Sequence, residues 1–304
     1  MEAEEEMIYK KNREGLKEYN IPGHWHENRK PGISAMIRAY NEEQWIGPCI
    51  ESILDIVDEI VISVDCNDRT KEIIQSFKSD KIKVYDYPFR IGSVEQENYP
   101  DSIHDKAYYS NWTMSKTTRK VICKWDADMI LLPNENLNLR KKAFKYNIVR
   151  LCGYNAVALN KNEMLLSNAE PIEHFEPRFF KVKPFLHFCQ ATERERQVNF
   201  HGTTDNLARL EVFTYDRTGI LKVFNPLIWK RVPAKLHLFR IKNCITKNDI
   251  YVKKPSFIHT KLMRNNPDDY WKPPNMDELK RRGNVIHATI PHFIYKKPED
   301  YINN

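Results

Sequence analysis

No two cysteines in this 304-residue sequence have the Cys-x-x-Cys spacing of a structural zinc site, and nothing in their placement indicates a disulfide framework. The six cysteines are scattered, at positions 49, 66, 123, 152, 189 and 244. Thiols distributed in this way fit a reducing compartment.

Long apolar runs are also absent. No stretch approaches the roughly 20 apolar residues that a membrane-spanning helix needs. The first six residues, Met1–Glu6, are mostly acidic, whereas a secretory signal peptide begins with basic residues. We therefore expect a cytoplasmic protein without a transmembrane segment, for which peripheral contact with a membrane stays open.

A dense basic stripe and a recognisable nucleic-acid-binding module are missing too, so we expect no nucleic-acid partner. The 48 Lys and Arg residues exceed the 41 Asp and Glu residues by seven. Short basic clusters occur at 140–142, 253–254 and 280–282. A mildly positive balance of this kind attracts a diphosphate, an anionic acceptor or an anionic lipid surface.

The chain contains no long linker rich in Gly, Ser or Pro, which favours one continuous α/β body. Its content of 41% hydrophobic and 12% aromatic residues is ordinary for a folded globule. We divide the sequence into a polar lead-in at 1–30, a first half at 31–135 and a second half with a C-terminal extension at 136–304.

Short apolar strands alternate with helical patterns over the first 130 residues. Strands are expected at 33–37, 59–64 and 82–87 and from 121, and helices after 41, at 70–77 and at 104–118. This order predicts a mainly parallel sheet flanked by helices. Ligands of such a sheet bind at the carboxyl ends of the strands, where Asn41, Asp65, Asp68 and Asp126 fall.

The fourth strand ends in two acidic residues, Asp126 and Asp128, between apolar segments. Residues i and i+2 of an extended segment point the same way, so both carboxylates could hold one hard cation with positions left open for a diphosphate. A solvated turn is the alternative, because turns favour Asp. The apolar surroundings favour the metal site, since a charge there must be paired or metal-bound.

Three segments taken together resemble glycosyltransferase family 2. Residues 38–43, Arg-Ala-Tyr-Asn-Glu-Glu, resemble the first loop of the family, whose common form begins with Pro. Residues 59–65 resemble its second strand, and residues 124–128, Lys-Trp-Asp-Ala-Asp, resemble its metal motif. The resemblance covers roughly residues 33 to 133, in order and at suitable separations.

The resemblance implies a GT-A fold, a nucleotide-diphosphate sugar donor, a Mn²⁺ or Mg²⁺ ion and usually inversion at the anomeric carbon. Asp65 would contact the nucleobase, Asp126 would lie near the ribose and Asp128 would coordinate the metal. The nucleoside pocket would include Ala39, Tyr40 and Glu42. Residues 31–135 would then bind the donor, and residues 136–304 would bind a glycan, lipid-linked or protein acceptor.

Two features depart from the family pattern. The loop after the second strand is short, with only two residues between Asp65 and Asp68, so Asp68 either reaches the ligand or caps the helix that begins near Thr70. Arg38 replaces the family's proline, and it either contacts phosphate or forms a surface ion pair.

An inverting transfer needs a carboxylate base for the acceptor hydroxyl, which must come from the second half of the chain. We place Glu176 first, followed by Asp205 and then Glu173. A third metal ligand in the family is often a histidine, for which His259 and His237 are the candidates, and a core histidine with a hydrogen-bond partner is the alternative for each.

Two other functions remain open. A sugar nucleotidyltransferase uses a similar sheet, but it would need a glycine-rich basic loop after the first strand, and residues 38–43 contain no glycine. A catalytically inactive carbohydrate-binding protein with a GT-A fold is the non-enzymatic alternative, against which the intact pair Asp126 and Asp128 argues.

Overall fold

The computed structural model describes part of the chain. The described residues are 17–22, 24–89, 91, 103, 106–133, 136–159, 164–167, 176–182, 187–190, 208–211, 249–260, 263, 281, 285–288 and 292–303. They fall into two compact units, one formed by 1–28, 88–116 and 182–248 and the other by 29–87, 117–181 and 249–304.

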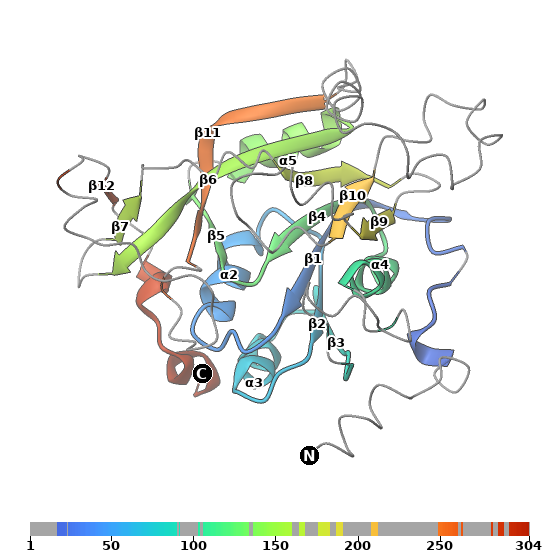
Figure 1. The fold of residues 1–304 in the computed structure, drawn as a ribbon, viewed down its shortest axis with the longest axis horizontal. Coiled ribbons are helices and arrows are strands. Elements are labelled where there is room, and N and C mark those ends of the chain that lie inside the picture. The colour runs from blue at the N-terminus through green and yellow to red at the C-terminus, as the bar shows by residue number, and fades with distance from the viewer. Residues whose placement is uncertain are drawn as a thin grey trace. The chain divides into compact units, whose positions relative to one another are not determined.

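The second unit contains a ten-stranded sheet (Figure 1), with strands in the order β12-β7-β6-β8-β4-β1-β2-β3. In addition, β11 pairs with β6, and β5 pairs with β11. The first four strands are β1 (Lys30–Ala39), β2 (Glu59–Val64), β3 (Ile82–Asp86) and β4 (Arg119–Asp126). All pairings among these four are parallel. The expected α/β class and parallel first half are thereby confirmed.

Two helices connect these strands, α2 (Ile46–Ile53) and α3 (Thr70–Ser76). Helix α2 turns Ile46, Cys49, Ile50 and Ile53 into the core, as their helical spacing predicts. These side chains join those of alternate β1 residues, starting with Ile33, in one hydrophobic cluster on one face of the sheet.

The second half of the sheet is largely antiparallel. It consists of β5 (Met129–Leu131), β6 (Ile148–Leu159), β7 (Met164–Ser167), β8 (Glu176–Lys181), β11 (Asp249–His259) and β12 (Val285–Ala288). Only β11 and β6 run parallel among the described pairs of this half. Helix α5 (Asn136–Lys145) lies behind β6 and β8 in the view of Figure 1 and buries Leu139 and Ala143 in the shared core.

The C-terminal segment of this unit packs on the first two helices. It consists of η8 (His292–Tyr295) and α10 (Pro298–Ile302). The Tyr301 ring stacks on Phe77 with centroids 5.5 Å apart, and a side chain at Gly47 would collide with that ring. Glycine at position 47 therefore allows the close approach of α2 to α10.

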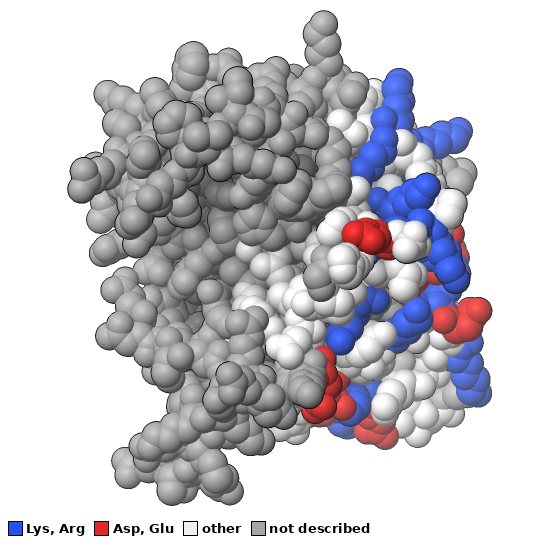
Figure 2. All heavy atoms as spheres, turned by 90° about the vertical axis from the view of Figure 1, so that its right-hand side faces the viewer, with Lys and Arg blue, Asp and Glu red and all other residues white. Residues whose placement is uncertain are grey.

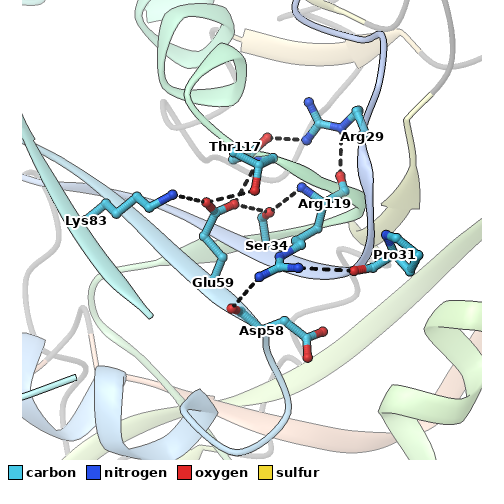
Figure 3. Close-up of polar contacts among 9 residues, drawn as sticks. Arg29, Pro31, Ser34, Asp58, Glu59, Lys83, Thr117 and Arg119 are labelled. Carbon is cyan, nitrogen blue, oxygen red and sulfur yellow. Dashed lines mark hydrogen bonds and ion pairs between the residues drawn. The ribbon is translucent and has the colours of Figure 1, made fainter. Parts of the chain in front are cut away.

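A polar network ties the amino ends of the parallel strands together (Figure 3). Glu59 is buried, with 2% of the residue exposed. Its carboxylate accepts hydrogen bonds from the Ser34 hydroxyl at 2.5 Å, the Thr118 amide at 2.7 Å and the Thr118 hydroxyl at 3.0 Å. Lys83 adds an ion pair at 2.7 Å. One buried carboxylate thus joins β1, β2, β3 and the segment that leads into β4.

The other unit is described only in part. It contains η2 (Lys17–Tyr19), α4 (Lys106–Ser115), β9 (His187–Gln190) and β10 (Ala208–Glu211). Asn111 of α4 exchanges two hydrogen bonds with the main chain of Phe188, at 2.7 and 2.9 Å. Among the described residues, no helix has the length and hydropathy to cross a membrane.

Candidate functional site at the carboxyl edge of the sheet

Strand register brings three of the expected donor-binding residues to one edge of the sheet. The Asp65 amide donates to the carbonyl of Ala39 at 3.3 Å, and Arg38 pairs in register with Asp126 of β4 and with Ser63 of β2. β1 therefore lies between the two acids, as the parallel order requires. The expectation that these positions share one edge is confirmed.

The loops after β1 and β2 are held against each other by hydrogen bonds. Asn41 adopts φ +50°, a left-handed conformation that Asn tolerates, and its side-chain oxygen accepts the Asn67 amide at 3.0 Å. The Glu42 amide donates to the Thr70 hydroxyl at 2.7 Å. Tyr40, by contrast, is 61% exposed at this edge and its ring is available for a ligand to stack on.

Asp68 has a structural role at the start of α3. Its carboxylate accepts the Thr70 amide at 3.0 Å and the Glu43 amide at 3.1 Å. Both oxygen atoms therefore have main-chain donors. Asp68 supports the start of α3 from the position before the N-cap, which is Arg69, and is not itself the N-cap. The same bonds fix the distance between the two loops.

Arg69 extends this connection to the C-terminal helix. Its guanidinium contacts the Glu43 carboxylate at 3.2 Å and the Glu299 carboxylate of α10 at 2.7 Å. All three side chains are partly exposed, so each contact is individually weak. Together they link both loops of the edge to a segment 230 residues away.

Asp65 differs from the other acids of this edge in the contacts of its carboxylate. No hydrogen bond or ion pair involves its carboxylate in the described part of the chain. Burial raises the pKa of this carboxyl above its usual value, because the charged form loses solvation without gaining a partner. Such a carboxylate is well suited to accept hydrogen bonds from a ligand.

Asp126 is held by an arginine from the second half of the sheet. The Arg178 guanidinium of β8 lies 2.6 Å from the Asp126 carboxylate, and the two side chains are 4% and 29% exposed. Burial opposes the charge of Asp126, but Arg178, helped by Lys124, outweighs it and keeps the pKa of the Asp126 carboxyl well below its usual range. Arg178 also packs over the ring of Phe257, at 5.4 Å from its centroid.

Asp128 faces a different partner. Residues 127 and 128 form a turn, so the extended geometry that predicted both acids to point the same way does not apply to Asp128. Its carboxylate lies 3.0 Å from the His259 imidazole Nε2, and both side chains are buried. The Thr260 amide and hydroxyl both donate to the Asp128 carbonyl, at 2.9 and 3.0 Å, which fixes the turn against β11.

The pair Asp128 and His259 fits part of a divalent metal site. Two ligand atoms in adjacent positions of an octahedral ion with bonds of about 2.1 Å lie about 3.0 Å apart, and the two side chains have that separation. The same distance also suits a direct hydrogen bond. Among the described residues, no group of three or more His, Cys, Asp or Glu side chains could hold a metal ion, so further ligands would have to come from a diphosphate, water or other parts of the chain.

The remaining candidates lie mostly outside the described residues. Glu173, Asp205 and His237 are not described. Glu176 is the first residue of β8, where its main chain pairs with Leu151, two positions before Arg178. Its side chain lies outside the description, so its role as the base stays a prediction.

Arg178 is the site residue that sequence reasoning missed. A signal was present, because an arginine between apolar residues of a strand is stable only when a carboxylate pairs with it. The sequence could not identify that carboxylate, since Asp126 lies 52 positions earlier. Thr260, which anchors the turn at Asp128, has no signal in the sequence.

Comparison with known proteins finds a family model that matches the segment carrying the first two loops of this edge. Residues 34–96 match the model of glycosyl transferase family 2. The expected resemblance to the family is confirmed over this segment, which contains the part of β1 from Ser34 onward, β2, β3 and the segments between them. No curated protein sequence matches the chain.

The similar solved structures include S. aureus TarS. TarS 1–349 is 12% identical, with 76% of this chain and 60% of that chain covered and a TM-score of 0.40. TarS 1–349 in complex with UDP-GlcNAc is 13% identical, with 82% and 64% covered and a TM-score of 0.43. This chain therefore spans about 60% of the length of TarS 1–349, and likenesses this low assign it neither fold nor function.

Proposed function

We propose that this chain is a GT-A glycosyltransferase that moves a sugar from a nucleotide-diphosphate sugar to an acceptor hydroxyl. The observation that carries the proposal is a coincidence of two independent results. The family match covers residues 34–96, and the same segment supplies Ala39, Tyr40 and Asp65 to the edge where Asp126 and Asp128 lie.

The nucleoside would bind at the exposed ring of Tyr40 and the carboxylate of Asp65. Asp65 offers acceptor oxygens that nothing in the described chain occupies, which suits the N–H group of a base. Arg178 keeps Asp126 ionised and oriented, so that its second oxygen can accept a ribose hydroxyl. Glu42 is buried, and its amide donates a hydrogen bond to the Thr70 hydroxyl. This bond would fix the loop that carries Tyr40 at the pocket.

Asp128 and His259 would hold a Mn²⁺ or Mg²⁺ ion. Their oxygen and nitrogen atoms are suitable ligands for such an ion, and Thr260 fixes the turn that presents Asp128. When bound, the ion would neutralise the charge that grows on the departing diphosphate.

The acceptor would approach from the second half of the chain. Glu176 is our first candidate for the base that takes the proton of the attacking hydroxyl, with Asp205 and Glu173 as the alternatives. Attack by an acceptor hydroxyl activated in this way would invert the anomeric carbon. A glycan, a lipid-linked sugar and a protein side chain all remain suitable acceptors.

The donor site is tested by thermal melting with a panel of nucleotide-diphosphate sugars, with and without Mn²⁺. A true donor at 100 times its Kd stabilises the protein by about 2.7 kcal/mol, and we expect this stabilisation only when the metal is present. Asp128→Asn should abolish it. Asp80→Asn removes an exposed carboxylate in a turn before β3 and should respond like the wild type.

Two outcomes would refute the donor site. One is indifference to every donor with either metal, which would favour a binding protein that has only the fold. The other is an Asp128→Asn variant that keeps the full metal-dependent stabilisation.

The base is tested separately by turnover. Glu176→Gln should leave donor affinity unchanged and lower kcat by about 10²-fold or more, because proton transfer is lost while the donor edge stays intact. Asp205→Asn and Glu173→Gln are the matched controls. If Glu176→Gln turns over normally, the role passes to whichever control fails.

A further inference from the structure

Helix α5 has a composition that sets it apart from the rest of the fold. Its ten residues include four basic ones and no acidic one. Leu139 and Ala143 face the core, whereas Lys141, Phe144 and Lys145 are exposed. The outer side of the helix is therefore both basic and aromatic.

Phe144 is unusual among the apolar side chains. It is 43% exposed, and within the described part of the chain the only other large hydrophobic side chain classed as exposed is Tyr40, which lies at the proposed donor site. The Arg140 guanidinium lies 5.3 Å from the centre of the Phe144 ring, and the Lys145 ammonium lies 5.2 Å from that of Tyr146. Two aromatic rings are thus presented among cations.

A neighbouring strand extends the positive charge. Lys181, the last residue of β8, donates to the carbonyl of Lys145 at 3.4 Å. Arg140 is already neutralised by Asp58, at 2.9 and 3.0 Å, but in the described chain no carboxylate pairs with the remaining lysines. We call Lys141, Lys142, Phe144, Lys145 and Lys181 the α5 patch.

The α5 patch lies at the end of the sheet opposite the donor edge. Arg140 donates to the carbonyl of Ile56 at 2.7 Å, just before β2 begins, and Lys181 pairs in register with Val121 near the start of β4. Figure 2 draws one side of the molecule, where the blue of Lys and Arg covers more of the described surface than the red of Asp and Glu. A large anionic partner could therefore cover this end without blocking the carboxyl edge.

We propose that the α5 patch docks on an anionic phospholipid surface, with Phe144 entering the headgroup region. Four lysines that pair with no carboxylate of the described chain match the charge of such a surface, and an exposed aromatic ring among them suits the interface between water and hydrocarbon. A soluble anionic polymer would offer no apolar environment for the Phe144 ring. This inference does not depend on the proposed transferase activity.

The expected binding is reversible and depends on salt. Each lysine near an anionic leaflet strengthens binding about fivefold, and the attraction falls off over the roughly 10 Å screening length of 0.1 M salt. The burial of one Phe ring adds a further contribution of several-fold that salt does not screen.

The test is co-sedimentation of the whole chain with phosphatidylcholine vesicles that contain, or do not contain, 30% phosphatidylserine, a fraction chosen at roughly the anionic level of a cytoplasmic leaflet. We expect binding only to the anionic vesicles. Lys141→Glu with Lys145→Glu should weaken it about 25-fold or more, from two lost contributions. Phe144→Ser should weaken it several-fold at every salt concentration.

The matched control is Lys78→Glu with Lys297→Glu, which changes the net charge equally at two exposed positions outside the patch. It should bind like the wild type. The patch variants must also melt within about 2 °C of the wild type, so that weaker binding is not loss of the fold.

Three results would overturn the proposal. They are equal binding to neutral vesicles, equal weakening by the control pair, and a Phe144→Ser variant that binds unchanged. Binding of heparin with no binding of anionic vesicles would likewise reject a lipid partner in favour of a soluble polyanion.

Discussion

Acidic residues at the two ends of the parallel strands have different surroundings, most clearly when Asp58 and Glu59 at the amino end are compared with Asp65 at the carboxyl end. At the amino end, Glu59 accepts from Ser34 and Thr118 and pairs with Lys83 (Figure 3). Asp58 pairs with Arg140. At the carboxyl end, the Asp65 carboxylate has no partner in the described chain. The pKa values follow this contrast: the pKa values of the Asp58 and Glu59 carboxyls are lowered, and the pKa of the Asp65 carboxyl is raised.

The contrast separates acids that stabilise the fold from Asp65, the acid that we propose to bind a ligand. A buried carboxylate with several donors favours the folded state, whereas one without donors loses solvation and gains nothing until a ligand arrives. Asp126 and Asp128 lie between these extremes, because each has one strong partner and keeps further acceptor capacity.

The largest effect on stability is expected from Glu59→Ala. It leaves the donors of Ser34, Thr118 and Lys83 without their shared acceptor, so the free energy of unfolding should fall by about 3 kcal/mol. Urea denaturation measures the change. Lys83→Ala is the control, and because Lys83 is 44% exposed it should lose less than about 1 kcal/mol. Equal losses for the two variants would contradict the central role of Glu59.

The same acid should control the response to low pH. Burial alone would raise the pKa of the Glu59 carboxyl, but the bonds from Lys83, Ser34 and Thr118 lower it below its usual 4.5. Its contribution to stability is therefore present above about pH 4.5 and is lost as the pH falls through the lower, folded-state value. Glu59→Gln should flatten this acid limb of the stability curve.

Asp65→Asn should move stability and binding in opposite directions. The raised pKa of Asp65 means that its charge opposes folding at neutral pH, and this opposition disappears as the pH falls below the usual 3.8. Removing the charge should therefore raise the free energy of unfolding at pH 7. Donor affinity should fall about tenfold or more, through loss of a charged hydrogen bond.

Calorimetric titration with the donor and denaturation in its absence measure the two halves of this prediction. Asp55→Asn, at an exposed position, should change neither quantity. A destabilised Asp65→Asn variant would show that Asp65 belongs with the structural acids of the other end.

The smallest effect is expected from Arg69→Gln. Its contacts with Glu43 and Glu299 are exposed, so the protein should melt almost as before. Looser loops should still raise the Kd for the donor, by about twofold to fivefold. Glu299→Gln leaves the contact between Arg69 and Glu43 in place, so this variant should raise the Kd less. An increase in Kd above tenfold for either variant would mean direct contact with the ligand.

The first half of the fold was predictable because its signals are local. Strand β2 has the bounds that its β-branched run indicates, and α3 ends within one residue of its expected end. The alternation of strands and helices then placed Ala39, Asp65 and Asp126 at one edge without any knowledge of contacts.

The second half was less predictable because its pairings are long-range. Strand β11 lies beside both β5 and β6, although the residues that pair are at least 101 positions apart in the sequence, as Ile148 and Asp249 are. No local pattern says that His259 will face Asp128 or that Arg178 will face Asp126. The turn at Asp128 was also missed, because its cause is the pair of hydrogen bonds from Thr260.

Composition, periodicity and motif order were enough to predict an α/β chain whose acidic residues gather at the carboxyl edge of parallel strands, since each depends on neighbours in sequence and on the general rules of parallel sheets. The partners of the acids were settled by folding. Burial and pairing between distant strands decide whether a carboxylate holds strands together, as that of Glu59 does, or stays without a partner in the described chain, as that of Asp65 does.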